Sequence, residues 1–497
     1  MKKIQKNPAL LVITFSLAFL LFSCDFLFDL GRAVKNEVLG SLGEGEFYAQ
    51  NMTNNQYYKL KASVLAEGKK CVIWAETNSG ISITKAEEIA ARYDEVIRPR
   101  IVDSFGKKNF YDSRAEQHFN DILDYANWFA NGDNGDGKLT ILLLDIKDGF
   151  KDPNKDSYVA GYFFSGNFFE QGQIPGSRHY SNGRDMIYID TYPGLNNLEK
   201  SYGTFAHELQ HLISWITSVQ TGKQKHLDTW IDEGLSSQAE HIYLNNYPLD
   251  KCDWFRDDPN KTMAQGNNFF AWDNRRESRL AILDDYATVY MFFRWLYLQS
   301  GKNESIFFDI GNLSGFDHNM IVNYAKDNIN SQWDTWEKLL QAWMIGNYIP
   351  DDTTYGYKGD TTLQGYAGAR PKLSTPTRTV MLFPGEGVYS TIQNPFTPTN
   401  IANTGKNIKY TGIRRGSISN NMPYTGDVLL TFNANTDNTD SREIGSLTGV
   451  AASVSRNIDA AVPEFSGAYI LDARDVLGRE QEKELDDLYN DYFFSGR

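Results

Sequence analysis

The chain has 497 residues, of which 41% are hydrophobic, 23% are charged and 14% are aromatic. This composition is typical of a globular protein and excludes a largely disordered, collagen-like or coiled-coil chain. The formal net charge is −14, and an acidic surface repels phosphate backbones, so nucleic acid is excluded as an expected partner. Three cysteines in a chain of this length also exclude a disulfide scaffold.

The N-terminus has the features of a bacterial export signal. Three lysines precede an apolar run over residues 9–22, which is shorter than the ~20 residues that a membrane-spanning helix needs. The run ends in the sequence LFSC at Cys24, which resembles a bacterial lipobox, in which the cysteine is lipidated and becomes the first mature residue. We therefore expect a signal peptide over residues 1–23 and a lipid on Cys24 that anchors the protein in the bacterial cell envelope, at the periplasmic face or the cell surface. An uncleaved anchor or a plain signal peptide is the alternative.

The rest of the chain is expected to be α+β. A tether over residues 24–44 comes first, followed by two strands within residues 57–75 and single strands at 139–146 and 186–190. Helical spacing occurs at residues 83–101 (with Thr84 as the expected N-cap), 114–129, 198–219, 230–244, 280–299 and 332–344. Residues 351–475 are rich in Gly, Thr and Asn and carry short β-prone runs at 379–383, 388–392, 428–432 and 469–471, which predicts a separate β-rich domain. An acidic helix is expected over residues 476–497, and a single disulfide between Cys71 and Cys252 is left open.

The segment from 203 to 212 carries the strongest chemical signal. It reads GTFAHELQHL and contains the pattern His207-Glu208-x-x-His211. Residues four apart on a helix differ in direction by about 40°, so both imidazoles converge on one ion. Glu208 lies roughly 100° round the helix from His207, at the border of such a site, where it would accept a proton from the nucleophilic water. The pattern therefore predicts His207 and His211 as zinc ligands and Glu208 as the general base.

A catalytic zinc takes three protein ligands and leaves one position open, and the next helical pattern offers the third ligand. Residues 230–240 read WIDEGLSSQAE, with Glu233 downstream of His211. This layout resembles the gluzincins, in which a glutamate from the following helix completes the site, and the resemblance implies Glu233 as the third ligand. Asp232 points about 100° away from Glu233 and is the weaker alternative. Glu240 is interpreted with equal weight as a residue that orients a ligand histidine and as an ordinary exposed glutamate.

The wider resemblance is to the hyicolysin family of zinc metallopeptidases. It rests on the HELQH and WIDEGLSSQAE segments, on the preceding MIYIDTYP strand and on DYATVYMFFRWL at residues 285–296, and it covers about residues 55–350. It implies a zincin-like catalytic domain over residues 45–350, in which a mixed sheet is combined with an active-site helix and a helical lobe. Ser237 stands where thermolysin-type enzymes carry an acidic residue, so the resemblance does not predict which residues hydrogen-bond to the ligand histidines.

Other candidate residues give weaker signals. None of the remaining histidines has metal-ligand spacing to another, so we expect solvated or hydrogen-bonded side chains for His118, His179, His226, His241 and His318. Residues 133–137 resemble a calcium loop only in part, because the acidic first and twelfth positions are missing, so calcium is the weaker alternative to a tight turn. Tyr286 and Tyr290 share one helix face, where core packing is favoured over the alternative of an oxyanion donor.

These features together predict an exported, lipid-anchored zinc endopeptidase that binds one zinc per chain and acts on protein or peptide substrates. Aminopeptidases among the gluzincins carry a GxMEN-like stretch that binds the substrate amine, and residues 180–201 contain none, which favours internal cleavage. The alternative from another class is a surface binding or adhesion lipoprotein that retains a peptidase-like fold without activity. The intact metal and base positions favour the enzyme.

Overall fold

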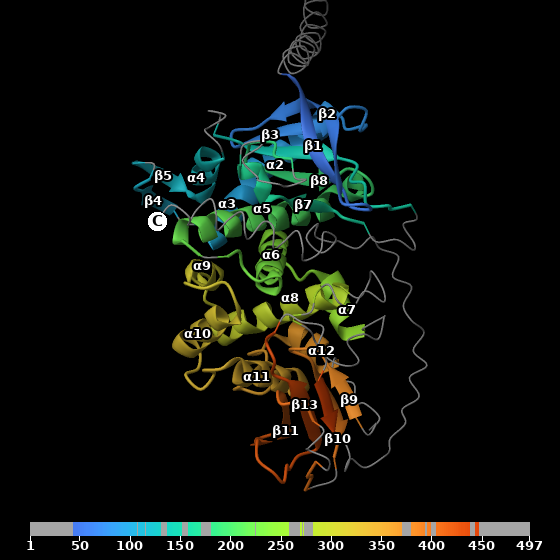
Figure 1. Cartoon of the computed structure of the whole chain (residues 1–497), viewed down its shortest axis with the longest axis vertical. Helices are drawn as coiled ribbons and strands as arrows, with labels where there is room; N and C mark the ends of the chain where they lie inside the picture. Colours follow the sequence, from blue (N-terminus) through green and yellow to red (C-terminus); the bar gives the residue numbers. More distant parts are fainter. Residues whose placement is uncertain are drawn as a thin grey trace, which may run out of the picture.

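The protein is described by a computed structural model that covers residues 43–446, except for 107, 115, 131–136, 152–157, 170–179, 224, 258–268, 271, 273–281, 370–378, 393–394, 399–403 and 438–442. Within these ranges it is an α+β protein, in which a mixed sheet, a set of helices and a second sheet follow one another along the long axis (Figure 1). No helix in the described ranges is both long and apolar enough to span a bilayer. The predictions for the signal peptide, Cys24, residues 133–136 and the 476–497 helix lie outside the described residues.

The main sheet has six strands in the order β1-β2-β3-β6-β8-β7. In chain order these are β1 (Glu44–Asn51), β2 (Gln56–Glu67), β3 (Cys71–Glu76), β6 (Leu139–Leu144), β7 (Gly161–Phe163) and β8 (Met186–Asp190). The first three strands are antiparallel, β3, β6 and β8 are parallel, and β7 runs antiparallel to β8 at the edge. Strands β6 and β8 are buried along their whole length, as parallel strands covered on both faces are. The strands predicted within 57–75, 139–146 and 186–190 are confirmed.

The helix predicted over residues 83–101 is present in three consecutive pieces. These are α2 (Ile83–Arg92), the π-helical turn η1 (Tyr93–Ile97) and α3 (Arg98–Phe105). The prediction of Thr84 as the N-cap is wrong. Ser82 has the extended backbone of a cap, and its side chain accepts a hydrogen bond from the backbone N–H of Lys85.

The helix predicted over residues 114–129 is only half helical. Residues Gln117–Asp121 form β5, which pairs with β4 (Lys108–Asp112), and the helix α4 occupies Ile122–Phe129. In β5 the buried side chains alternate, since Phe119 and Asp121 face inward and their neighbours are exposed. The Asp121 carboxylate then accepts hydrogen bonds from two backbone N–H groups of the first turn of α4. This cap places the start of the helix several residues later than the sequence predicted.

Three long helices stack beneath the main sheet (Figure 1). Helix α5 (Leu198–Thr221) lies along one face of the sheet, α6 (Thr229–Leu244) packs against α5, and α8 (Ile282–Gln299) packs against α6. All three were predicted from their apolar spacing. The contact between α6 and α8 depends on Gly234, because a Cβ atom there would lie 2.3 Å from ring atoms of Phe293.

The described residues form further helices after α6, one of which, α7, packs against α8. They are α7 (Leu249–Asp257), α9 (Ile306–Asn312), α10 (His318–Asn328), α11 (Trp336–Tyr348) and α12 (Thr361–Ala369). Helix α11 begins four residues later than the predicted 332–344 helix. Its N-cap is Thr335, whose side chain accepts a hydrogen bond from the backbone N–H of Lys338.

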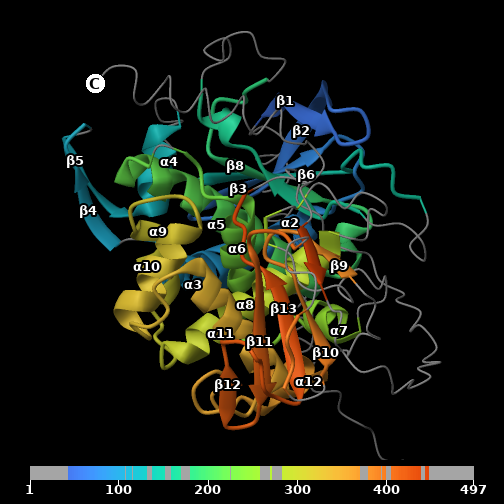
Figure 2. The same cartoon turned by 60° about the horizontal axis from the view of Figure 1, so that its bottom comes forward.

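A second sheet lies on the far side of the helices, in front of α8 and α11 in Figure 2. Its order is β10-β13-β11-β12, and a separate pair joins β9 to β14. The strands are β9 (Thr379–Leu382), β10 (Gly387–Thr391), β11 (Ile408–Arg414), β12 (Ser417–Ser419), β13 (Val428–Asn433) and β14 (Glu443–Ser446). The Tyr389 hydroxyl donates to the backbone carbonyl of Met344 at 2.7 Å, which ties β10 to α11. The strand runs predicted near 379, 388 and 428 are confirmed, the run at 469–471 lies outside the described residues, and a separate domain over 351–475 stays a prediction.

The two described cysteines are free thiols. Cys71 lies on β3 and Cys252 on α7, and both are buried. The disulfide that the sequence left open is therefore not formed. Burial raises the pKa of both thiols, that of Cys252 to about 12, so neither is a reactive thiolate near neutral pH.

Candidate metal centre

The two histidines of the HExxH pattern lie side by side in the middle of α5. The helix begins after Asn197, whose side chain accepts a hydrogen bond from the backbone N–H of Lys200, and it ends at Gly222, whose φ of 68° favours glycine. The imidazole rings of His207 and His211 are 4.7 Å apart between centroids, and both side chains are almost fully buried. The spacing of four residues thus places both rings on one face, as predicted.

Glu233 reaches both imidazoles from near the start of α6. Its Oε2 lies 3.2 Å from Nε2 of His207, and its Oε1 lies 3.5 Å from Nε2 of His211. One ligand atom from each of the three residues lies within 4.8 Å of the other two. Zinc bound tetrahedrally at about 2.1 Å from each ligand would place its ligand atoms about 3.4 Å apart. The cluster therefore has both the donor chemistry and the spacing of a metal-ion site.

The second nitrogen of each histidine contacts a carboxylate of α6. Nδ1 of His207 lies 2.7 Å from Oε1 of Glu240, and Nδ1 of His211 lies 2.9 Å from Oδ2 of Asp232. Such contacts set the tautomer, because an Nδ1–H that donates to a carboxylate leaves Nε2 as an acceptor for a metal. Asp232, the weaker ligand candidate, thus contacts the outer nitrogen of His211, and Glu240 is a buried partner of His207 rather than an exposed residue.

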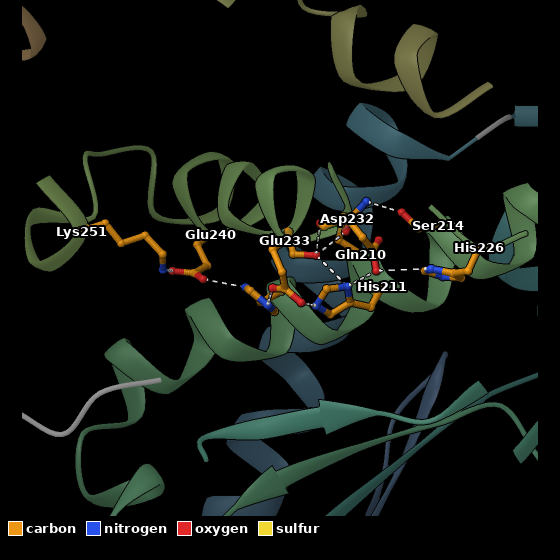
Figure 3. A network of polar contacts seen from close by, with 10 residues as sticks. Gln210, His211, Ser214, His226, Asp232, Glu233, Glu240 and Lys251 are labelled. Atoms are coloured by element: carbon orange, nitrogen blue, oxygen red, sulfur yellow. Dashed lines mark hydrogen bonds and ion pairs between the residues drawn. The ribbon is translucent and has the colours of Figure 1, made fainter. Parts of the chain in front are cut away.

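Lys251, Ser236 and His226 extend this network, which Figure 3 shows from Lys251 to His226. The Nζ of Lys251 on α7 lies 2.6 Å from Oε2 of Glu240. The Ser236 hydroxyl lies 3.0 Å from Nδ1 of His211. Nδ1 of His226 lies 3.9 Å from Oδ2 of Asp232, so this histidine lies near the site. Nothing in the sequence spacing pointed to Lys251, because it belongs to a different helix from its partner.

The buried charges of the network perturb the pKa values of its members. Burial acts to lower the pKa of His207, but the hydrogen bonds to Glu233 and Glu240 outweigh it and raise the pKa to about 9. Burial acts to raise the pKa of Glu240, but the charge of Lys251 and the hydrogen bond to His207 lower it to about 2. The Glu240 carboxylate is therefore ionised, and a proton competes with a metal for His207 at neutral pH.

Glu208 lies between α5 and the edge of the main sheet. Its side chain is 1% exposed. The edge strand β7 passes directly over it, since a Cβ atom built on Gly161 would lie 3.1 Å from Cγ of Glu208 and 2.9 Å from Cγ2 of Thr204. The absence of a side chain at Gly161 thus allows the strand to approach the predicted base.

The two tyrosines of α8 have different surroundings. The ring of Tyr286 lies 6.4 Å from that of His207, and it contacts Trp272 edge-on at 5.1 Å. The Tyr290 hydroxyl lies 3.0 Å from Nδ1 of His241, a contact between α8 and the last turns of α6. The structure therefore brings Tyr286 to the cluster, whereas Tyr290 serves the packing of the helices.

The other predicted histidine positions add no ligand among the described residues. His118 on β5 lies against the ring of Tyr111 at 4.9 Å. His318 at the start of α10 packs edge-on against Phe270 and is partly buried, which lowers its pKa. His179 lies outside the described residues.

The sequence matches no protein-family model. The chain is 29% identical over 272 residues to a protein from Staphylococcus hyicus described as neutral metalloprotease ShpI. The alignment covers 53% of this chain and 53% of ShpI, so the chain spans about half the length of the curated relative that it matches.

Proposed function

We propose that the protein is an exported, lipid-anchored zinc-dependent endopeptidase of the gluzincin type with a zincin-like catalytic domain. The observation that carries the proposal is the buried cluster of His207, His211 and Glu233, whose ligand atoms lie within 4.8 Å of one another, and two imidazoles with one carboxylate are a ligand set of catalytic zinc. The similarity to a neutral metalloprotease supports the same chemistry. A glutamate from the helix after the HExxH helix supports the gluzincin type.

Zinc held by these three residues would supply Lewis acidity, polarising the scissile carbonyl and lowering the pKa of the attacking water. Glu208 is the residue placed to accept the proton of that water and to pass it to the leaving amine nitrogen. Its position one residue after His207 puts it beside the cluster rather than within it. Glu240 and Asp232 hold the two imidazoles with Nε2 directed toward Glu233.

An extended peptide would bind by adding to the main sheet as a strand beside β7. Among the described residues this strand is the last of the main sheet and pairs only with β8, and an edge strand offers backbone hydrogen bonds to an added strand. Because Gly161 of β7 lies against Glu208, a peptide paired there would have its backbone beside the base. Tyr286 is the candidate oxyanion donor, since it is the tyrosine of α8 near His207.

Metal analysis combined with a proteolysis assay tests the proposal. The purified full chain is expected to hold about one zinc and to cleave casein, to lose the activity with a chelator and to regain it with added zinc. His211→Ala should hold little zinc and be inactive, because one of three ligands is gone. Equal zinc in wild type and His211→Ala, or casein cleavage that survives complete zinc removal, would refute the proposal.

The anchor rests on the N-terminal sequence alone. The LFSC segment at the end of the apolar run supports lipidation of Cys24 and retention in the bacterial envelope. We also propose that residues 351–475 form a β-rich domain attached to the catalytic domain. The contact between β10 and α11 lies at the junction of the two.

A further inference from the structure

Lys251 is a buried cation that contacts the metal cluster only through another residue. It lies in the first turn of α7 and is 8% exposed. Its Nζ is 2.6 Å from Oε2 of Glu240, while the other carboxylate oxygen of Glu240 is 2.7 Å from Nδ1 of His207. Figure 3 shows Lys251 at the end of this series of contacts, on the side of Glu240 away from Glu233.

Four acidic residues are buried at the cluster. Glu208, Asp232, Glu233 and Glu240 are each at most 4% exposed. Burying a carboxylate in its ionised form is costly unless a positive charge or a hydrogen-bond donor lies beside it. Lys251 provides such a positive charge, and it does so at the carboxylate that holds His207.

We propose that Lys251 is a positioning residue of the metal centre, which fixes the direction of the Glu240 carboxylate and offsets its charge so that His207 presents Nε2 to the metal. The inference rests on the proposed zinc site and extends it to a third helix. Helix α7 is held against α8, where the Trp254 indole N–H donates to Asp284. Lys251 would thus make the geometry of the cluster depend on the docking of α7.

The alternative is that Lys251 only stabilises the packing of α7 against α6. The two roles differ in whether loss of the lysine charge lowers the stability of the protein or its zinc affinity. A role in packing alone predicts lower stability with an unchanged zinc affinity of the folded protein. A positioning role predicts weaker zinc binding, up to the about 10- to 100-fold that the loss of a direct partner of a metal-ligating histidine costs. This loss must disappear in a variant in which Glu240 can no longer accept from Lys251.

A double-mutant cycle on the full chain separates the roles. Zinc dissociation constants are measured by competition with a chromophoric chelator for wild type, Lys251→Met, Glu240→Gln and the double variant. The visible spectrum of the cobalt(II)-loaded proteins reports ligand geometry without reference to activity. Lys251→Arg keeps the charge and is expected to lie closer to wild type than Lys251→Met. If Lys251→Met does not fold, Lys251→Gln replaces it in the cycle, because glutamine keeps an N–H donor without the charge.

Lys223 provides the matched control. It is also buried, at 4% exposed against 8% for Lys251. It lies just after the end of α5, and its Nζ donates to the backbone carbonyl of Leu313. Lys223→Met therefore removes a buried lysine without touching Glu240. Its zinc affinity and cobalt spectrum are expected to match wild type.

The proposal predicts that Lys251→Met weakens zinc binding and alters the cobalt spectrum, and that the same change in the Glu240→Gln background adds less than about twofold. Equal losses in both backgrounds, or unchanged affinity in folded Lys251→Met, would overturn it. A wild type that binds zinc and shows this coupling but cleaves no protein would refute the proposed peptidase and leave the role of Lys251 intact. A wild type without a zinc site would overturn both.

Discussion

Gly161→Ala tests whether the edge strand β7 positions the base. The added methyl would lie 2.9 Å from Cγ2 of Thr204, 2.9 Å from the backbone carbonyl oxygen of Tyr188 and 3.1 Å from Cγ of Glu208. Carbon atoms pack best about 3.5–4.0 Å apart, so Thr204 must move by roughly 0.6 Å and Glu208 by roughly 0.4 Å relative to β7. The Tyr188 carbonyl belongs to the adjacent strand β8 and cannot move alone, so the displacement falls on β7 and on the side chains of Thr204 and Glu208.

Two effects of this substitution are expected. Overpacking of a filled interior costs about 1–3 kcal/mol of unfolding free energy, measurable by chemical denaturation. Since a displacement of about 1 Å in a catalytic group can cost about 100-fold in rate, a shift near 0.4 Å at Glu208 should lower kcat by roughly fivefold or more, with zinc content unchanged. A fluorogenic peptide assay with metal analysis measures both quantities.

Gly387→Ala is the matched control for this prediction. A Cβ atom there would lie 2.6 Å from Sδ of Met344 and 3.0 Å from Cβ of Phe432, in the second sheet and away from the cluster. It should lose comparable stability while kcat stays within about twofold of wild type. The reasoning is refuted if Gly161→Ala is destabilised and yet keeps the kcat of wild type, as the control does.

Three further predictions concern the cluster and the N-terminus. Tyr286→Phe should lower kcat by more than about fivefold, whereas Tyr290→Phe should lower stability by about 1 kcal/mol with kcat unchanged; equal kcat in both variants and wild type would remove tyrosine from the mechanism. Because the pKa of His207 is raised to about 9 in the metal-free protein, binding of zinc displaces a proton below that pH. The apparent zinc dissociation constant should therefore rise by up to tenfold for each pH unit lowered from 8 to 6, and a constant value would show that no ligand is protonated. Cys24→Ala should abolish lipid attachment, and an identical mature N-terminal mass and detergent partitioning in both proteins would refute the anchor.

The sequence predicted those parts of the site that lie on one continuous pattern. Helix α5 carries apolar residues at helical spacing, strand β8 is a short β-prone run, and the HExxH spacing fixes the relation of His207 to His211 within a single helix. Glu233 was implied by the resemblance of the two successive helical segments to the gluzincins. The structure adds that these residues meet with their ligand atoms close together.

The remaining features depend on the packing of separate segments. Lys251 pairs with Glu240 because α7 docks beside α6, and no spacing within one helix encodes that contact. The region before α4 was predicted as helix because short apolar runs fit both periods, and the cap at Asp121 decides between them. The need for glycine at position 161 can be recognised only when β7 is placed over Glu208.

Glu208→Gln is the most direct test of the central claim, because it replaces the proposed base by an amide of nearly the same shape and leaves all three proposed ligands in place. Zinc content and kcat/KM on a peptide substrate are measured on the same preparation. The account predicts one zinc per chain, as in wild type, with kcat/KM lower by about 100- to 10,000-fold. A Glu208→Gln protein that holds its full zinc and cleaves the peptide at the wild-type rate would contradict it.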